Sequence, residues 1–160
     1  MSKTAFVEFR GDGFWAYDVA LGMLFKQVID HAVSLGTESD WLQKLIQQWR
    51  FNAVVADCGL YLDDDWSQDQ FATVDDLLQQ ACRTLAEHGH FTAEEMSGWN
   101  ILEGQGVFDR GHGGYHTAPV IELGQAIRQL LSGTLEPAPT GTWWLYGAPE
   151  GRISIGKRTE

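Results

Sequence analysis

Hydrophobic positions recur at helical spacing over much of the chain. Over residues 14–35, apolar side chains return every three or four positions and leave only a narrow polar stripe, which predicts a helix in a central place in the fold. A second helix is predicted after Thr37 and Asp40, which form a candidate capping pair, and its pattern can be followed to Cys58, with Gly59 as its end.

A third helix has the clearest amphipathic pattern in the chain. Its apolar stripe covers residues 74–88, Thr73 and Asp76 form a candidate opening pair, and Gly89 ends it. The segment LYLDDDWSQDQ before it, residues 60–70, is predicted to be a loop.

Two more helices are marked by their capping residues. Thr92 and Glu95 match a capping box, which predicts a short helix that ends near Trp99. Thr117 is a candidate N-cap for a last helix that ends at Gly133. Apolar side chains recur at helical spacing along this helix and are expected to face the core.

Strands are predicted to be few and short. Residues 5–9 alternate between the two faces of a strand, residues 100–103 and 107–109 allow two short strands, and residues 142–155 are typical of a hairpin. The pattern therefore predicts an α+β fold: one helix-dominated domain over residues 1–160, with a few short antiparallel strands that include a C-terminal hairpin.

Length and apolar content restrict the class of protein. A chain of 160 residues fits one domain. It has no apolar run near the roughly 20 residues that a membrane-spanning helix needs, and its N-terminus lacks the features of a signal peptide. We therefore expect a cytoplasmic protein. The simpler interpretation of Cys58 and Cys82 is two reduced thiols, although a disulfide stays open.

Negative charge is concentrated in the middle third of the chain. The net charge is −11, and residues 51–109 hold twelve acidic residues against the single base Arg83. Such a field repels phosphate backbones and anionic lipids, which argues against nucleic acid or a membrane as the direct partner. It favours a basic protein or a cation.

The acidic loop and the helix start after it form the candidate partner-binding surface. In one interpretation the carboxylates only keep an exposed loop soluble, and the loop's tryptophan packs into the core. In the other, the aromatic side chains are contact anchors within a ring of carboxylates that captures an Arg- or Lys-rich partner. The candidate residues are Tyr61, Asp63, Asp64, Asp65, Trp66, Asp69, Asp75 and Asp76.

Histidines offer a second kind of site. The segment DRGHGGYH, residues 109–116, has glycines that suit a connecting loop, and it does not match a phosphate-binding motif. No motif for a nucleophilic enzyme is present, so no catalytic residue and no cofactor is predicted. The alternative is a metal site that combines acidic loop residues with the histidines His88, His90, His112 and His116.

Two segments carry a resemblance to known proteins. WNILEGQGVFDRG, residues 99–111, and the stretch APVIELGQAIRQLLSGTLEPAPTGTWWLYGAPEGRISI, residues 118–155, resemble a group of small acidic bacterial proteins of unassigned function. In size, acidity and tryptophan content the chain is also similar to the immunity proteins of bacterial polymorphic toxin systems. The resemblance implies a cytosolic protein that binds and neutralises a toxin, and it assigns no role to any single residue.

Charge and resemblance together favour an acidic protein-binding module. The leading hypothesis is an immunity protein that captures a basic partner, such as a nuclease toxin, by electrostatic attraction. A metal-dependent enzyme with a His/Asp site, an acidic chaperone for a secreted protein and a structural subunit remain alternatives. Association into a homodimer is also left open.

Overall fold

Five helices and seven strands are seen in the part of the chain that the computed structural model describes, which comprises residues 4–36, 39–54, 60–63, 65–101, 104 and 114–157. The strands are β1 (Thr4–Phe9), β2 (Asp12–Tyr17), β3 (Leu60–Tyr61), β4 (His90–Thr92), β5 (Gly114–His116), β6 (Thr142–Tyr146) and β7 (Ile153–Gly156). The helices are α1 (Asp18–Ser34), α2 (Asp40–Val54), α3 (Gln68–His88), α4 (Ala93–Ser97) and α5 (Ala118–Ser132).

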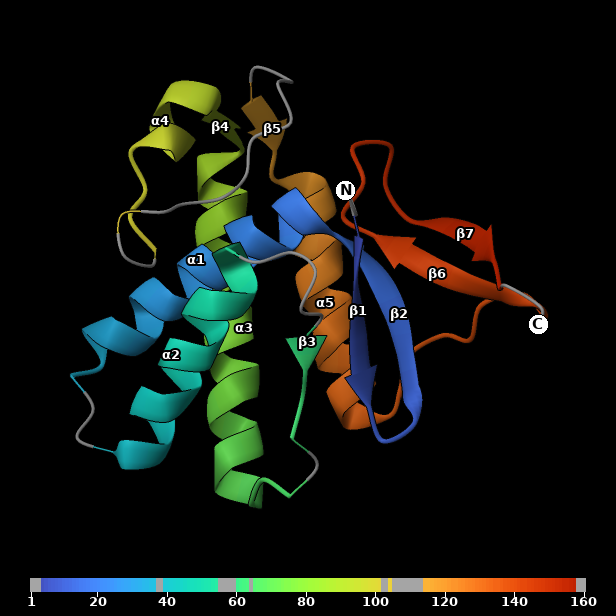
Figure 1. Ribbon diagram of the computed structural model, residues 1–160, viewed down its shortest axis with the longest axis horizontal. Helices are drawn as coiled ribbons and strands as arrows, with labels where there is room; N and C mark the ends of the chain where they lie inside the picture. Colours follow the sequence, from blue (N-terminus) through green and yellow to red (C-terminus); the bar gives the residue numbers. More distant parts are fainter. Residues whose placement is uncertain are drawn as a thin grey trace.

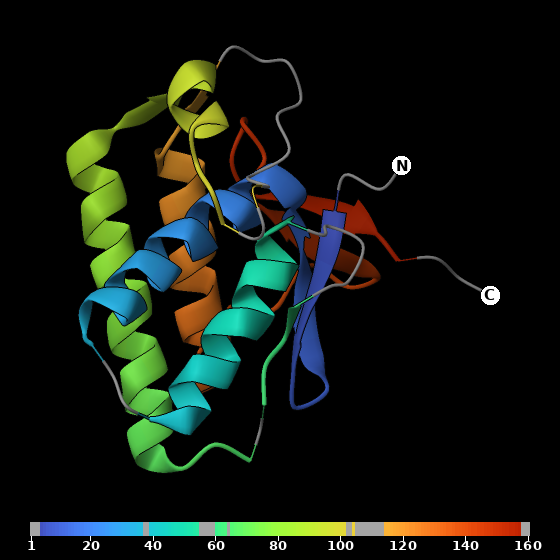
Figure 2. The same cartoon turned by 60° about the vertical axis from the view of Figure 1, so that its left-hand side comes forward.

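A five-stranded sheet lies to one side of the helices, as Figures 1 and 2 show from two directions. Its strand order is β3-β1-β2-β6-β7, and β4 and β5 form a separate two-stranded ribbon. The predicted α+β class and the antiparallel C-terminal hairpin of β6 and β7 are confirmed. The sheet is mixed, because β3 pairs parallel to β1 and β6 pairs parallel to β2. In the described part of the chain, no helix has the length and apolar character to cross a membrane.

Helix α1 is central, as its pattern predicted, but it begins later than expected. It packs against α2, α3 and α5 and buries most of its residues. Residues 14–17, predicted as its first turn, instead belong to β2, which pairs with β1 across a tight turn. Arg10 and Gly11 in that turn both have positive φ values, 51° and 79°. This geometry matches the right-handed twist of a β-hairpin, so the chain reverses here and starts the helix only at Asp18.

Helix α3 begins six residues before the predicted start at residue 74. The Ser67 hydroxyl accepts a hydrogen bond from the Gln70 N–H at 3.2 Å, and the Gln70 side chain accepts one from the Ser67 N–H at 2.9 Å. This is a capping box one turn and a half before the predicted pair of Thr73 and Asp76. The apolar stripe misled the prediction because Val74 is the first residue of α3 that is fully buried.

The remaining helix boundaries agree with the prediction where they can be compared. Thr92 and Glu95 form the expected capping box of α4, and α3 and α5 end at the expected glycines. Thr117 precedes α5 but makes no side-chain capping bond. Asn100 and Ile101 are not in a strand. The other predicted features lie outside the described residues, namely Thr37, Cys58, Gly59, 102–103 and 107–109.

The two faces of the sheet differ in what covers them. Phe14 and Tyr146 point toward the helices and contact each other, with ring centroids 4.8 Å apart. On the opposite face, Phe6 contacts Trp15 and Trp143 at centroid distances of 5.0 and 5.1 Å. These three outer rings are partly exposed. The side chains that the sheet contributes to the hydrophobic core therefore lie mainly on the face that packs against the helices.

Candidate functional site

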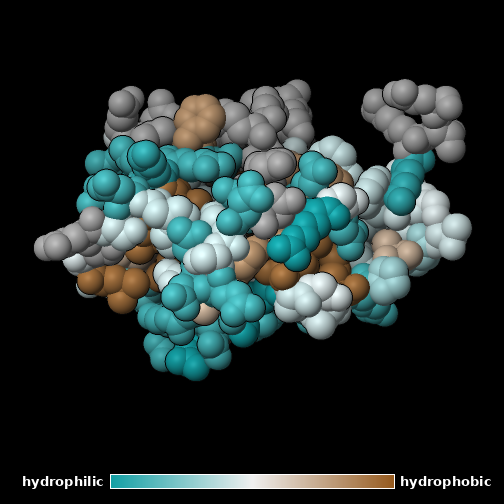
Figure 3. Space-filling model, turned by 90° about the horizontal axis from the view of Figure 1, so that it is seen from below, coloured by the Kyte–Doolittle hydropathy of each residue, from teal (hydrophilic) through white to brown (hydrophobic). Residues whose placement is uncertain are grey.

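The predicted acidic surface lies where the chain passes from β3 into α3. This is the lower end of the molecule in Figure 1, where α3 begins. Asp63, Asp65 and Asp69 are all exposed there, and within the described part of the chain none of them forms an ion pair. Seen from below in Figure 3, this end is mostly hydrophilic, with hydrophobic side chains visible in between. Exposed carboxylates at this end are free to meet a cationic partner.

Two buried side chains hold the acidic loop against the core. Leu62 is 3% exposed and Trp66 is 7% exposed, so the loop is fixed at both ends. Between them, the Asp63 carboxylate accepts a hydrogen bond from the backbone N–H of Asp65 at 2.8 Å, which closes a local turn. The described part of the loop thus exposes the carboxylates of Asp63 and Asp65.

Trp66 is part of the core in the free protein. Its ring packs edge-on against Trp41, with centroids 6.1 Å apart, and against Phe71, with centroids 5.5 Å apart. The structure thus agrees with the interpretation in which this tryptophan supports the loop from below, and it leaves little of the ring for a partner to bury. Tyr61 lies in β3, but its side chain and the whole of Asp64 lie outside the described residues.

A groove of about 400 Å³ runs between α2 and the acidic loop. Its walls combine carboxylates, indole rings and one lysine, and they consist of Trp41, Lys44, Leu45, Gln48, Asp63, Asp65 and Trp66. Carboxylates beside an aromatic ring suit a guanidinium or ammonium group, because charge attraction and cation–π attraction act together. On the α2 side of the groove, the positive charge of Lys44 offsets part of the negative charge of Asp63 and Asp65. The loop side of the groove is therefore the stronger cation-binding wall.

Asp75 and Asp76 are adjacent in sequence but differ in what they can offer a partner. Asp75 binds Arg128 of α5 through both carboxylate oxygens, at 2.8 and 3.2 Å, and this hydrogen bonding raises the pKa of the Arg128 guanidinium. Asp76 is exposed and accepts a hydrogen bond from the Gln80 side chain at 2.6 Å. Since the charge of Asp75 is neutralised within the fold, the predicted acidic residues that remain available in the described part of the chain are Asp63, Asp65, Asp69 and Asp76.

Of the four predicted histidines, the three that the structure describes do not form a metal-binding cluster with one another. His88 stacks on Phe91 with centroids 3.9 Å apart, and its Nε2 atom lies 3.0 Å from a carboxylate oxygen of Glu95. The pKa of Glu95 is lowered first by a hydrogen bond from the Thr92 backbone N–H and to a lesser degree by His88. His88 is therefore occupied by contacts that hold α4 to the end of α3.

The segment DRGHGGYH is only partly a connecting loop. Residues 114–116 form β5, which pairs with β4 and brings His116 opposite His90, while residues 109–113, including His112, lie outside the described residues. Among the described residues, no group of three or more His, Cys, Asp or Glu side chains is arranged to hold a metal ion. The described part of the chain therefore shows no centre with three or more protein ligands for the alternative metalloenzyme.

The buried thiol of Cys82 is unsuited to act as a nucleophile. Burial raises its pKa to about 11, so the reactive thiolate is scarce at neutral pH. Its sulfur faces α5, where it lies 3.8 Å from the backbone oxygen of Ile121. Cys82 acts as a packing residue.

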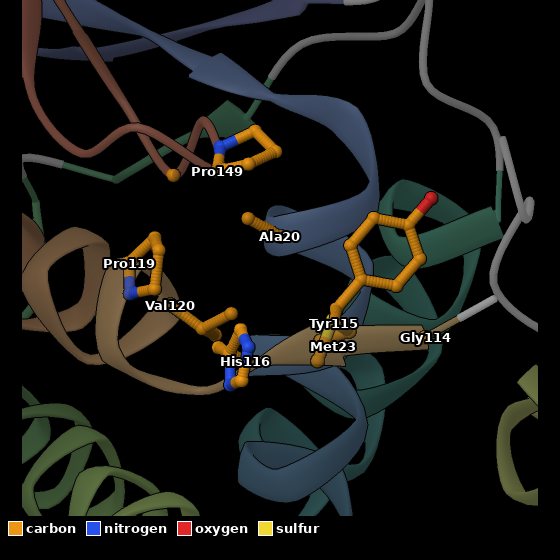
Figure 4. Close-up of a pocket in the computed structure, with 9 residues that line it drawn as sticks. Ala20, Met23, Gly114, Tyr115, His116, Pro119, Val120 and Pro149 are labelled. Carbon is orange, nitrogen blue, oxygen red and sulfur yellow. The ribbon is translucent and has the colours of Figure 1, made fainter. Parts of the chain in front are cut away.

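A second cavity, which the sequence did not indicate, lies at the other end of the molecule. It has a volume of about 130 Å³ and lies between α1, β5, the start of α5 and the loop after β6. Figure 4 shows Met23, Val120, Pro119 and Pro149 around it, with His116 at its lower edge. A Cβ at Gly147 would lie 2.6 Å from the Cβ of Ala20, so this glycine allows the loop after β6 to approach α1 closely. Apart from His116, the lining residues are mostly apolar and suit binding by shape rather than a reaction.

Comparison with known proteins leaves the site to be interpreted from its own chemistry. No family model, no curated protein and no solved structure matches the chain. The resemblance to immunity proteins therefore stays a prediction.

Proposed function

We propose that this protein is a binding module that captures a basic protein partner, in the manner of an immunity protein that neutralises a toxin. The observation that carries the proposal is the groove beside the acidic loop, where Asp63 and Asp65 are exposed and line the same groove as Trp41. An Arg or Lys side chain of the partner would enter between these groups. Asp69, on the first turn of α3, extends the same acidic surface.

Charge in this arrangement acts mainly on the rate and the specificity of association. Complementary potentials steer two proteins together and disfavour partners of like charge, while their net effect on affinity depends on desolvation. Trp66 is already packed in the free protein, so the carboxylates and not this ring make the contact. A nuclease bound here would have part of its cationic substrate-binding surface covered.

The proposal is tested by removing the available carboxylates and measuring binding to a basic partner. The genes next to this one are first searched for a basic toxin-like protein, which then serves as the partner, and the variant carries Asp63→Asn, Asp65→Asn and Asp69→Asn. At about 50 mM salt we expect the association rate to fall about tenfold or more. The rate should also lose most of its salt dependence, as measured by surface plasmon resonance between about 50 and 300 mM salt.

A matched control removes the same amount of charge elsewhere. Glu87, Glu122 and Glu150 are exposed acids outside the acidic loop, and their replacement by Gln changes the net charge equally. We expect this control to bind almost like the wild type. Equal losses in both variants would show that only net charge matters, and an unchanged rate in the Asn variant would refute the proposed surface. A partner captured only when unfolded would indicate a chaperone instead.

A further inference from the structure

His90 and His116 face each other across the ribbon of β4 and β5. They are directly paired in the antiparallel register, so both imidazoles project from the same face. The backbone N–H of Thr117 donates to the carbonyl of Gly89 at 3.0 Å, just outside this pair. The two histidines therefore occupy a non-hydrogen-bonded position, where opposed side chains approach each other most closely.

The opposite face of the same ribbon explains why the histidines point outward. Phe91 and Tyr115 are the next opposed pair, and they are 6% and 8% exposed. Because side chains alternate along a strand, burial of this aromatic pair turns both histidines toward solvent. Gly114 provides space beside His90, since a Cβ at this glycine would lie 2.9 Å from the Cε1 atom of the imidazole.

The ring nitrogens of this pair are not engaged elsewhere in the described part of the chain. His88 is bound to Glu95 and His31 to the Thr84 hydroxyl, at 3.0 and 2.9 Å, whereas the rings of His90 and His116 contact each other and form no hydrogen bond or ion pair within the described residues. Their centroids are 4.9 Å apart, with an interplanar angle of 62°. Two imidazoles that bind one ion at about 2.0–2.1 Å with roughly 100° between the bonds would also have centroids about 5 Å apart.

We propose that His90 and His116 form a two-histidine binding site for a late first-row divalent transition-metal ion, with Cu²⁺ bound more tightly than Zn²⁺. Imidazole suits both ions, and Cu²⁺ has the highest affinity for such ligands in the divalent series. Water completes the coordination, so the ion is exchangeable and keeps open positions. The bound ion crosslinks β4, which follows α3, to β5, which leads into α5.

Copper titration of the full-length protein tests the site. We expect isothermal titration calorimetry in a weakly coordinating buffer to show one Cu²⁺ per chain for the wild type. His90→Gln and His116→Gln should each weaken binding about tenfold or more, because the second imidazole otherwise binds from within the same molecule. His88→Gln is the matched control and should bind as the wild type does.

Spectroscopy on the wild type gives a second measurement that does not depend on how the variants fold. Nuclear magnetic resonance with trace Cu²⁺ should broaden the signals of His90, His116 and their ribbon neighbours first. The absence of Cu²⁺ binding by the wild type would overturn the proposal, as would unchanged binding by the His90→Gln/His116→Gln double variant or broadening centred on other residues. A loss in His88→Gln equal to that of the two ribbon variants would also contradict it.

Discussion

At the scale of single residues, Gly124 and Cys82 show how residues far apart in the sequence can restrict each other's size. Gly124 stands in the middle of α5, where a glycine normally costs about 1 kcal/mol relative to alanine. Its place is explained by contacts with two other helices. A Cβ at this position would lie 2.6 Å from the Cys82 sulfur in α3 and 3.2 Å from a methyl group of Leu24 in α1.

We expect Gly124→Ala to destabilise the protein although alanine is the better helix former. Overpacking a filled core costs about 1–3 kcal/mol, which equals or exceeds the gain in helix propensity. In a Cys82→Ala background the sulfur is absent, so the same substitution should cost at least about 1 kcal/mol less. Urea unfolding of the four proteins of this cycle measures both effects. Equal costs in the two backgrounds would contradict the contact with Cys82.

At the scale of secondary-structure elements, the start of α3 decides how the acidic loop is presented. The helix begins at Gln68, so Asp69 lies in its first turn, where a carboxylate is favoured by the helix dipole. If the helix began at residue 74 instead, Asp69 would be part of a longer, less defined loop. The capping box of Ser67 therefore fixes part of the candidate site as well as the helix.

The two candidate caps of α3 can be told apart by alanine substitution. Ser67→Ala removes the hydroxyl that accepts from the Gln70 N–H, and we expect it to lower the free energy of unfolding by about 1 kcal/mol. Thr73→Ala removes a hydroxyl that donates only to the Asp69 carbonyl within the helix, and it should change stability by less than about 0.5 kcal/mol. Chemical denaturation measures both, and the reverse order would place the start of the helix near residue 74.

At the scale of the whole molecule, local sequence patterns predicted the helices better than the strands, because a strand depends on the strand with which it pairs. The stripes of α3 and α5 and the cap at Thr92 were readable because they depend on near neighbours in the chain. Residues 14–17 were assigned to a helix because their apolar spacing also fits one, and only pairing with β1 makes them a strand. The segment 114–116 was likewise read as a connector because its partner strand lies far away in the sequence.

The candidate site was predictable in position but not in detail. Charge counting located the acidic surface, yet it could not separate Asp75, which binds Arg128, from the exposed Asp76. It also could not decide whether Trp66 packs in the core or contacts a partner, since that depends on Trp41 in α2 and Phe71 in α3. These distinctions depend on tertiary contacts that no single segment encodes.

Net charge leads to a prediction about salt. The chain carries −11 charges, and at low ionic strength their mutual repulsion acts over roughly 30 Å, compared with about 10 Å at 0.1 M salt. We expect the thermal unfolding midpoint to rise by a few degrees between about 10 and 200 mM NaCl, because screening relieves repulsion in the compact state. A falling midpoint in calorimetry would mean that ion pairs such as Arg128–Asp75 outweigh the repulsion. Near the isoelectric point of 4.7 the rise should disappear.

The parallel pairing of β2 with β6 has a consequence for how the protein is made. Trp15 and Ala16 hydrogen-bond into the sheet beside Leu145 and Tyr146, so the middle of the sheet joins the two ends of the chain. During synthesis on a ribosome, the β2 edge of the hairpin of β1 and β2 stays without its neighbour until β6 (Thr142–Tyr146) has been translated, long after β3 can cover the β1 edge. An unpaired edge strand is a site of aggregation. Nascent chains that stop before β6 should therefore depend on cellular chaperones, whereas the finished chain closes its own sheet.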